Sequence, residues 1–75
     1  MTPYRDIDGD SNVSAYEYGS DWIQVQFKDG SVYEYTNSSA GQGNIDTMKQ
    51  LAVAGEGLNS HIQRYVRKGY SRKMR

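Results

Sequence analysis

The residues best suited to contact a ligand lie at the C-terminal end of this 75-residue chain. Residues 57–75 contain no acidic side chain but six basic ones: Arg64, Arg67, Lys68, Arg72, Lys73 and Arg75. Guanidinium and ammonium groups neutralise phosphates, and the interspersed Tyr65 and Tyr70 can stack on unpaired bases. The pattern therefore predicts contact with RNA or another single-stranded nucleic acid. The alternative is a solvated helix end, because cations there stabilise a helix by ~0.3–1 kcal/mol without any partner.

A second candidate surface is a set of aromatic side chains nearer the N-terminus. If two strands pair across Gly19–Asp21, then Tyr16, Tyr18 and Trp22 share one sheet face, flanked by Gln24 and Gln26. Stacking on such rings contributes about 1–3 kcal/mol per base, so this face is a predicted stacking platform. The alternative is a second hydrophobic cluster covered by the N-terminal residues or by the last helix, since a chain with few aliphatic residues has structural uses for tyrosine.

Oxygen-bearing residues near the N-terminus partly match a calcium-binding loop. The six ligand positions of such a loop would be occupied by Asp6, Asp8, Asp10, Asn12, Ser14 and Glu17. However, Ser11 stands where the sharp turn requires glycine, and the five residues before the pattern leave no room for an entering helix. The segment also has the sequence of a strand, so we predict no metal site.

The remaining polar residues favour structural roles. His61 is the sole histidine, and a general base would need an acidic partner such as Asp46 or Glu56, which the spacing does not place beside it. Asn59 is expected to bond the backbone of the preceding loop. Residues 38–43 are glycine-rich but lack the lysine of a phosphate-binding loop. We therefore predict neither an enzyme nor a cofactor.

Length and composition predict a single small domain whose tyrosines share the core. The chain has only eleven Val, Ile and Leu residues but seven tyrosines, and it has no cysteine for a disulfide or a thiolate metal site. Residues 1–56 hold nine acids and three bases, a net charge of −6, which the basic end balances. No signal-like segment or apolar run of about 20 residues occurs, so a cytoplasmic protein without membrane contact is expected.

Two β-hairpins are predicted from the alternation of apolar residues. The first joins strands over residues 11–18 and 22–28. Its three-residue turn would place Tyr18 opposite Trp22, Tyr16 opposite Gln24, and Val13 opposite Phe27.

The second hairpin turns at Lys28–Gly30, and its loop length decides which side chains face the core. A type I turn with left-handed Gly30 places Tyr33 opposite Val25 and Tyr35 opposite Ile23, which adds two rings to a core short of mass. A two-residue turn would instead bury Val32, Glu34 and Thr36, and an unpaired buried carboxylate is costly. We predict the first register.

Two helices are predicted after the strands. Residues 37–43 favour a loop, the first helix follows Asn44 as its N-cap and ends at Gly55, and the second begins near Leu58 and ends near Gly69. The sequence thus predicts an α+β fold, in which a three-stranded antiparallel meander packs against two C-terminal helices. This domain would span residues 11–69, between a flexible leader, residues 1–10, and a basic tail, residues 70–75.

About 50 residues resemble the KTSC domain, a small bacterial module also found at the C-terminus of some lysyl-tRNA synthetases. The resemblance rests on a first block with Phe27, Gly30, Tyr33 and Tyr35, and on a second block with Gly55, Leu58, Asn59 and Ile62. The family's Val-Pro step after the second tyrosine is missing here. The resemblance implies the fold and a suggestion of RNA binding, and no established activity.

Together these observations predict a non-enzymatic binding module. The leading hypothesis is a module for RNA or single-stranded nucleic acid, in which the basic end positions the backbone and aromatic rings stack on bases. The rival hypothesis is a protein-interaction module whose tyrosine-rich sheet face contacts another protein or a second copy of this chain.

Overall fold

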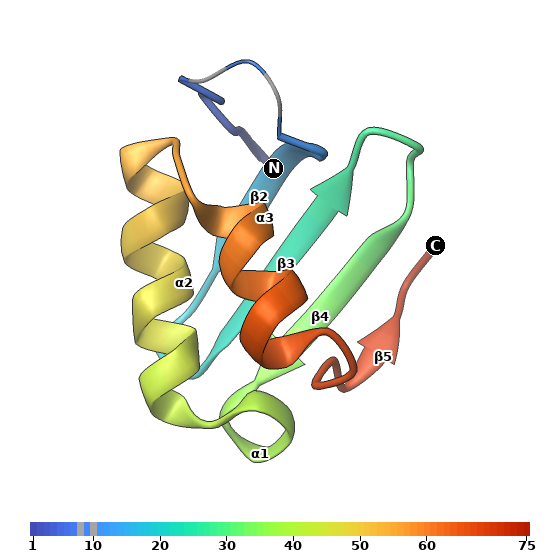
Figure 1. Ribbon diagram of the computed structural model, residues 1–75. Coiled ribbons are helices and arrows are strands. Elements are labelled where there is room, and N and C mark those ends of the chain that lie inside the picture. The colour runs from blue at the N-terminus through green and yellow to red at the C-terminus, as the bar shows by residue number, and fades with distance from the viewer. Residues whose placement is uncertain (8, 10) are drawn as a thin grey trace.

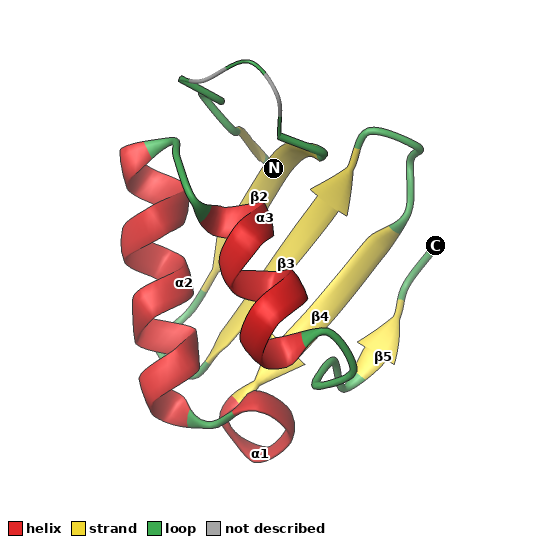
Figure 2. Cartoon of the chain, in the orientation of Figure 1, coloured by secondary structure: helices red, strands yellow, loops and turns green. Residues whose placement is uncertain are grey.

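An antiparallel sheet carries all of the larger helices on one of its faces (Figure 1). The computed structural model describes residues 1–7, 9 and 11–75. Within them the strands follow the order of the chain: β1 (Thr2–Pro3), β2 (Val13–Tyr18), β3 (Trp22–Phe27), β4 (Val32–Thr36) and β5 (Arg72–Lys73). The helical segments, shown in red in Figure 2, are α1 (Asn37–Ala40), α2 (Gln42–Ala54), α3 (Leu58–His61) and the π-helix η1 (Ile62–Val66).

The predicted α+β class with an antiparallel sheet is confirmed, but the predicted number of elements is wrong. The described residues form five strands rather than three, because a two-residue strand from each end of the chain extends the meander. They also form three α-helices rather than two, the last of which continues directly into η1. None of these helices has the length and apolar character needed to cross a membrane.

The β3–β4 hairpin has the predicted register. Tyr33 pairs with Val25 and Tyr35 with Ile23. The Gly30 N–H donates to the Phe27 carbonyl at 2.9 Å, and Gly30 has a φ of 92°, the left-handed conformation that a three-residue loop requires. Tyr35 therefore points under the helices and is only 2% exposed.

The β2–β3 hairpin differs from the predicted register. Val13 pairs with Phe27 as expected, but Tyr16 lies opposite Val25 and Tyr18 opposite Ile23. An irregularity between Val13 and Ala15 gives β2 one extra residue, which is a β-bulge, and the side chains beyond it change face. Tyr16 consequently points into the core rather than to the open face of the sheet.

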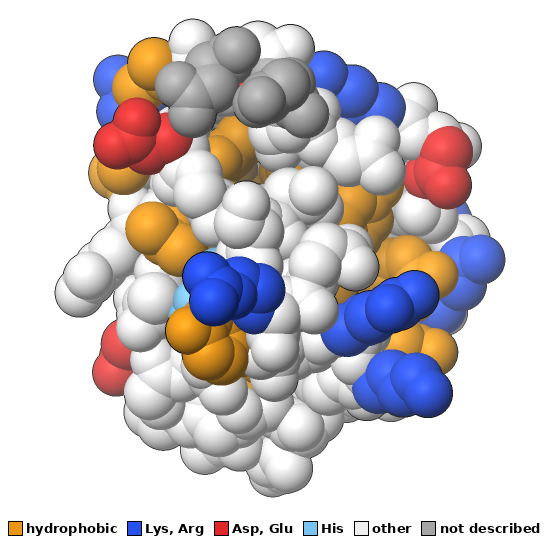
Figure 3. All heavy atoms as spheres, in the orientation of Figure 1, with side chains coloured by type: hydrophobic (Ala, Val, Ile, Leu, Met, Phe, Trp, Pro, Cys, Tyr) orange, Lys and Arg blue, Asp and Glu red, His pale blue; other side chains and the backbone are white. Residues whose placement is uncertain are grey.

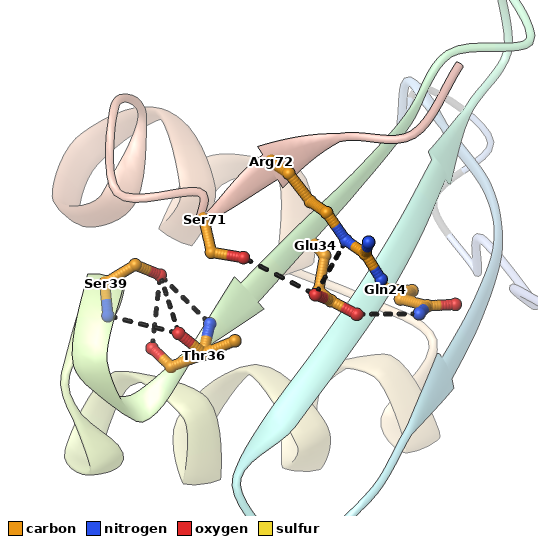
Figure 4. A network of polar contacts seen from close by, with 6 residues as sticks. All are labelled: Gln24, Glu34, Thr36, Ser39, Ser71 and Arg72. Carbon is orange, nitrogen blue, oxygen red and sulfur yellow. Dashed lines mark hydrogen bonds and ion pairs between the residues drawn. The ribbon is translucent and has the colours of Figure 1, made fainter.

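The first helical turn begins earlier than predicted. Thr36 is the N-cap of α1, and its side chain and that of Ser39 bond each other's backbone N–H in a capping box (Figure 4). Residues 37–40 are therefore helical rather than a loop, and Asn44 lies inside α2 rather than at its N-cap. The predicted end is confirmed, because Gly55 closes α2 in the left-handed conformation with its N–H bonded to the Leu51 carbonyl.

The core lies between the sheet and the helices. Its largest fully buried side chains come from β2, β3, β4, α2, α3 and η1: Val13, Ile23, Val25, Tyr35, Ile45, Met48, Leu58 and Ile62. Tyr16 is 9% exposed and belongs to the same cluster, while Val32 is buried outside it. Tyrosines thus supply core mass, as the shortage of aliphatic residues predicts.

Both chain ends are attached to this body. At the N-terminal end Thr2–Pro3 pair with β2, and Tyr4 is only 6% exposed with its hydroxyl accepting from the Leu58 N–H at 3.4 Å. At the C-terminal end the Ser71 and Met74 N–H groups bond carbonyls of β4. The predicted leader, residues 1–10, and the predicted basic tail, residues 70–75, thus each contribute a short edge strand, because edge strands accept short partners that local sequence does not reveal.

Candidate functional site

The predicted basic residues are divided between two faces of the sheet. On the open face, the Arg72 Nε donates to the Glu34 Oε1 at 3.1 Å, and the other carboxylate oxygen accepts from the Gln24 amide (Figure 4). The Gln24 hydrogen bond, followed by Arg72, lowers the pKa of Glu34 against the opposing effect of burial. Arg72 therefore attaches β5 to β4 and is not directed toward a ligand.

The other face carries a groove on the β4–β5 side of the sheet, which we call the β4 edge. The groove has a volume of about 310 Å³ and lies between the β3–β4 turn, the N-terminal half of η1 and the segment after η1. Its aromatic and apolar lining consists of Phe27, Tyr33, Tyr35, Ile62 and Tyr70. Its polar lining consists of Asn12, Asp29, Ser31, Gln63 and Arg67. On the β5 side of the space-filling view, basic and hydrophobic side chains alternate (Figure 3).

The aromatic rings of the groove pack edge to face. The Tyr33 and Tyr70 ring centroids are 4.8 Å apart with the rings at 70°, and the Phe27 and Tyr33 ring centroids are 5.8 Å apart with the rings at 79°. The Lys73 Nζ lies 5.7 Å from the Tyr33 centroid, within the range of a cation–π contact. The exposed ring of Tyr70, the half-buried ring of Tyr33 and positive charge are thus adjacent, although they come from β4 and the C-terminal segment.

Tyr35 lies at the floor of this groove with an unusual polar environment. Its hydroxyl makes no hydrogen bond within the described residues, even though the side chain is 98% buried. Burial raises the pKa of Tyr35 to about 12, with smaller contributions from the phenols of Tyr33 and Tyr70. The hydroxyl therefore keeps its proton near neutral pH and remains a hydrogen-bond donor.

The predicted stacking platform is not formed. Tyr16 is in the core, and Tyr18 stacks on it with ring centroids 6.2 Å apart. Trp22 pairs with Thr36 on the opposite face, where its indole covers Gly19 so closely that a Cβ there would clash with the Trp22 ring. The three rings therefore do not share a surface, because the bulge in β2 changes the face of both tyrosines.

The basic residues on the helical segment separate as well. Arg67 lines the groove, whereas Arg64 lies over the ring of Tyr65, 5.8 Å from its centroid, and neither Arg64 nor Lys68 lines it. Among the predicted residues, Arg67 and Lys73 are thus brought to one place. Tyr33, Tyr35 and Phe27, which were predicted as core residues only, are the part of the site that the sequence did not reveal.

Within residues 1–7, 9 and 11–75, no acidic side chain bonds His61. Its Nε2 lies 3.1 Å from the Asn44 Oδ1, and burial lowers its pKa. Asp46 instead lies near Lys49 and accepts from Gln42. The same Asn44 side chain bonds the backbone, since its Nδ2 donates to the Ala40 carbonyl at 2.8 Å. This is the kind of side-chain-to-backbone bond that was expected of Asn59.

A polar pocket on the N-terminal side contains the one enclosed side-chain oxygen without a partner in the described part of the chain. This atom is the Oδ1 of Asn59, and the predicted bond from it to the preceding loop is absent. Asp6 also lines the pocket, where it bonds the Ser11 N–H and Lys28. The described residues contain no group of three or more acidic, His or Cys side chains arranged to hold a metal ion, and Asp8 and Asp10 of the calcium pattern lie outside them.

Comparison with protein-family models, with curated proteins and with solved structures finds no match to this chain. The resemblance to the KTSC domain therefore stays a prediction from the residues that carry it. Function has to be argued from the groove itself.

Proposed function

We propose that the groove at the β4 edge binds single-stranded nucleic acid without catalysing a reaction. The observation that carries the proposal is that Tyr33, Tyr70 and Arg67 line one hollow, while a second cation, Lys73, lies over the ring of Tyr33. An unpaired base packs against the aromatic rings, and the cations contact the phosphates on either side of it. This combination of stacking surface and positive charge is the one that sequence-tolerant single-strand binding uses.

The size and charge of the groove favour an unpaired base over a duplex. Its volume of about 310 Å³ lies near the lower end of the roughly 300–1,000 Å³ range of small-ligand sites, so it accommodates one base rather than a stretch of helix. Bases in a duplex are stacked and paired, and their rings are not available to a narrow hollow. Asp29 on the turn side of the rim repels phosphate, whereas Arg67 attracts it, which orients the strand.

A salt titration with fluorescent ten-nucleotide RNA tests the proposal. If about three phosphates are engaged, log affinity should fall with log salt at a slope of about −2, because each single-strand contact contributes about −0.7. Arg67→Ala combined with Lys73→Ala should bring the slope closer to zero by about 1.4.

Lys49→Ala is the matched control for that variant. Lys49 also lies over a tyrosine ring, at 5.6 Å from the centroid of Tyr18, but it is away from the groove. The control should keep the slope of the unmodified protein. Absence of binding to RNA and to single-stranded DNA even at low salt would remove the proposed function.

A second candidate function is protein interaction, which is favoured by an apolar hollow between β2 and α2. Tyr18 and Val53 there are 44% and 49% exposed, more than their apolar surface would favour in water. Recovery of the protein from cell extract with and without nuclease separates the two functions. A companion protein retained after nuclease treatment, and lost on Val53→Lys, would favour this hollow as a protein contact.

A further inference from the structure

The Tyr35 hydroxyl borders the groove and has no hydrogen-bond partner within the described residues. In those residues the only enclosed side-chain oxygen or nitrogen without a partner is the Oδ1 of Asn59. The phenol oxygen of Tyr35, which also lacks a partner, is therefore not enclosed by protein and borders the groove that its side chain lines. A phenylalanine at this position would fill the core equally well, so packing does not explain the hydroxyl.

We propose that the Tyr35 hydroxyl is the hydrogen-bond donor that holds the edge of the bound base at the floor of the groove. This inference rests on the proposed binding of single-stranded nucleic acid and adds to it the contact that selects a base over an apolar side chain. Every nucleobase carries carbonyl oxygens or ring nitrogens at its edge, and these accept a hydrogen bond from a phenol.

The surroundings of Tyr35 fix how the base enters. The rings of Tyr33 and Tyr70 stand edge to face at 4.8 Å in the lining above it, so a planar ligand contacts them while its edge points to the floor. Ile62 and Phe27 make the rest of the floor apolar. A bound base that covers the hydroxyl displaces water from it, so the hydrogen bond between them then counts for more than one at the rim.

The raised pKa supports the same role for the hydroxyl. Since the phenol stays protonated well above neutral pH, it donates under all ordinary conditions and does not repel the electron-rich edge of a base. A charged donor at the same depth would have required a buried counter-ion, whereas a neutral phenol does not.

Tyr35→Phe tests the inference with two RNA probes of equal length and charge. One probe is a ten-nucleotide RNA with normal bases, and the other has abasic residues throughout. For the probe with bases, Tyr35→Phe should lower affinity roughly threefold to tenfold, the effect of one lost hydrogen bond. For the abasic probe the variant and the unmodified protein should bind equally.

The melting temperature distinguishes this role of the Tyr35 hydroxyl from a purely structural one, which would make the hydroxyl necessary for stability. Because the hydroxyl has no partner in the described residues, Tyr35→Phe should leave the melting temperature unchanged or raise it slightly. Tyr16→Phe, which removes a hydroxyl from a core tyrosine that does not line the groove, is the matched control and should bind both probes normally.

The outcomes separate the inference from the function on which it rests. Equal affinity of Tyr35→Phe and the unmodified protein for the probe with bases overturns the inference alone, provided that the unmodified protein binds with the expected salt slope. A clear fall in melting temperature also overturns it, since the hydroxyl would then have a partner in the protein. Failure of the unmodified protein to bind either probe overturns the proposed function, and the inference with it.

Discussion

The two sides of the sheet, the β1–β2 side (the β2 edge) and the β4–β5 side (the β4 edge), carry the same kinds of residues in different arrangements. At the β2 edge Tyr16 and Tyr18 stack in parallel, and Lys49 lies 5.6 Å from the Tyr18 centroid. At the β4 edge Tyr33 and Tyr70 pack edge to face, and Lys73 lies 5.7 Å from the Tyr33 centroid. Each edge thus has two tyrosines and a lysine over a ring, although only the second has the features of a nucleic-acid site.

The two edges differ in whether the lysine already has protein partners and in how the two tyrosine rings are arranged. The Lys49 Nζ donates to the Gly19 and Ser20 carbonyls and lies 3.7 Å from the Asp46 carboxylate. In the described residues no carboxylate lies within ion-pair distance of Lys73 or Arg67. A cation with protein partners gains little from a phosphate, because it must give up contacts of similar strength.

The arrangement of rings adds to this difference. In the parallel Tyr16–Tyr18 pair, one ring is buried in the core and covers part of its neighbour. The hollow beside them is lined by Tyr18, by Arg5 and by Lys49, Gln50, Val53 and Ala54 of α2. In the Tyr33–Tyr70 pair, the perpendicular rings form a corner that opens into a groove with polar residues at its rim. Residue type and spacing along the chain therefore do not distinguish the two edges, whereas ring geometry and existing ion pairs do.

Tyr70→Ala and Tyr18→Ala provide the strongest test of this comparison, because the two side chains are similarly exposed, at 40% and 44%. Tyr70→Ala should weaken binding of ten-nucleotide RNA by about 1–3 kcal/mol, the contribution of one stacking ring, while Tyr18→Ala should not change it. Fluorescence anisotropy measures the affinities, and thermal unfolding shows whether both variants remain folded. Equal losses from the two variants would mean that the edges do not differ in function.

The β3–β4 register could be predicted because local chemistry determines it. Asp29-Gly30 specifies the turn, and the lack of aliphatic residues requires Tyr35 to be buried. The β2–β3 register could not, because the bulge near Ser14 has no signal in a run of alternating residues, and one extra residue was enough to misplace Tyr16. The position of the bulge depends on how β2 pairs with β3, so the sequence of β2 alone does not predict it.

The groove was predicted only in part for a related reason. Arg67 and Lys73 were identified from charge alone, but their aromatic partners come from strands about 35 residues earlier in the chain. The short β5 that brings Lys73 over Tyr33 depends on the neighbouring Arg72 and Glu34, whose pairing has no local pattern. A usable signal did exist, since Phe27, Tyr33 and Tyr35 share the face on which the basic helix must pack.

Glu34→Gln should have a smaller effect than the tyrosine variants. It weakens the attachment of β5 to β4 and leaves the β2 edge unchanged. The ionised Glu34 attaches β5 through Arg72, and because its folded pKa lies below the ordinary value of 4.5, its stabilisation is fully present above about pH 4.5. This stabilisation is lost as the pH falls through the folded pKa. Since Arg72 is 64% exposed, we expect no more than about 1 kcal/mol.

NMR amide shifts of Ser71 and Arg72 between pH 6 and pH 3 measure this attachment. In the unmodified protein they should move with a midpoint below pH 4.5, and in Glu34→Gln the movement should be absent, because glutamine keeps the hydrogen bond with Gln24 but has no charge to lose. The amide of Tyr18, at the edge without this ion pair, should respond alike in both proteins. Identical titrations of Ser71 in both proteins would show that β5 is held by its backbone bonds alone. The β4 edge would then be as independent of charge as the β2 edge.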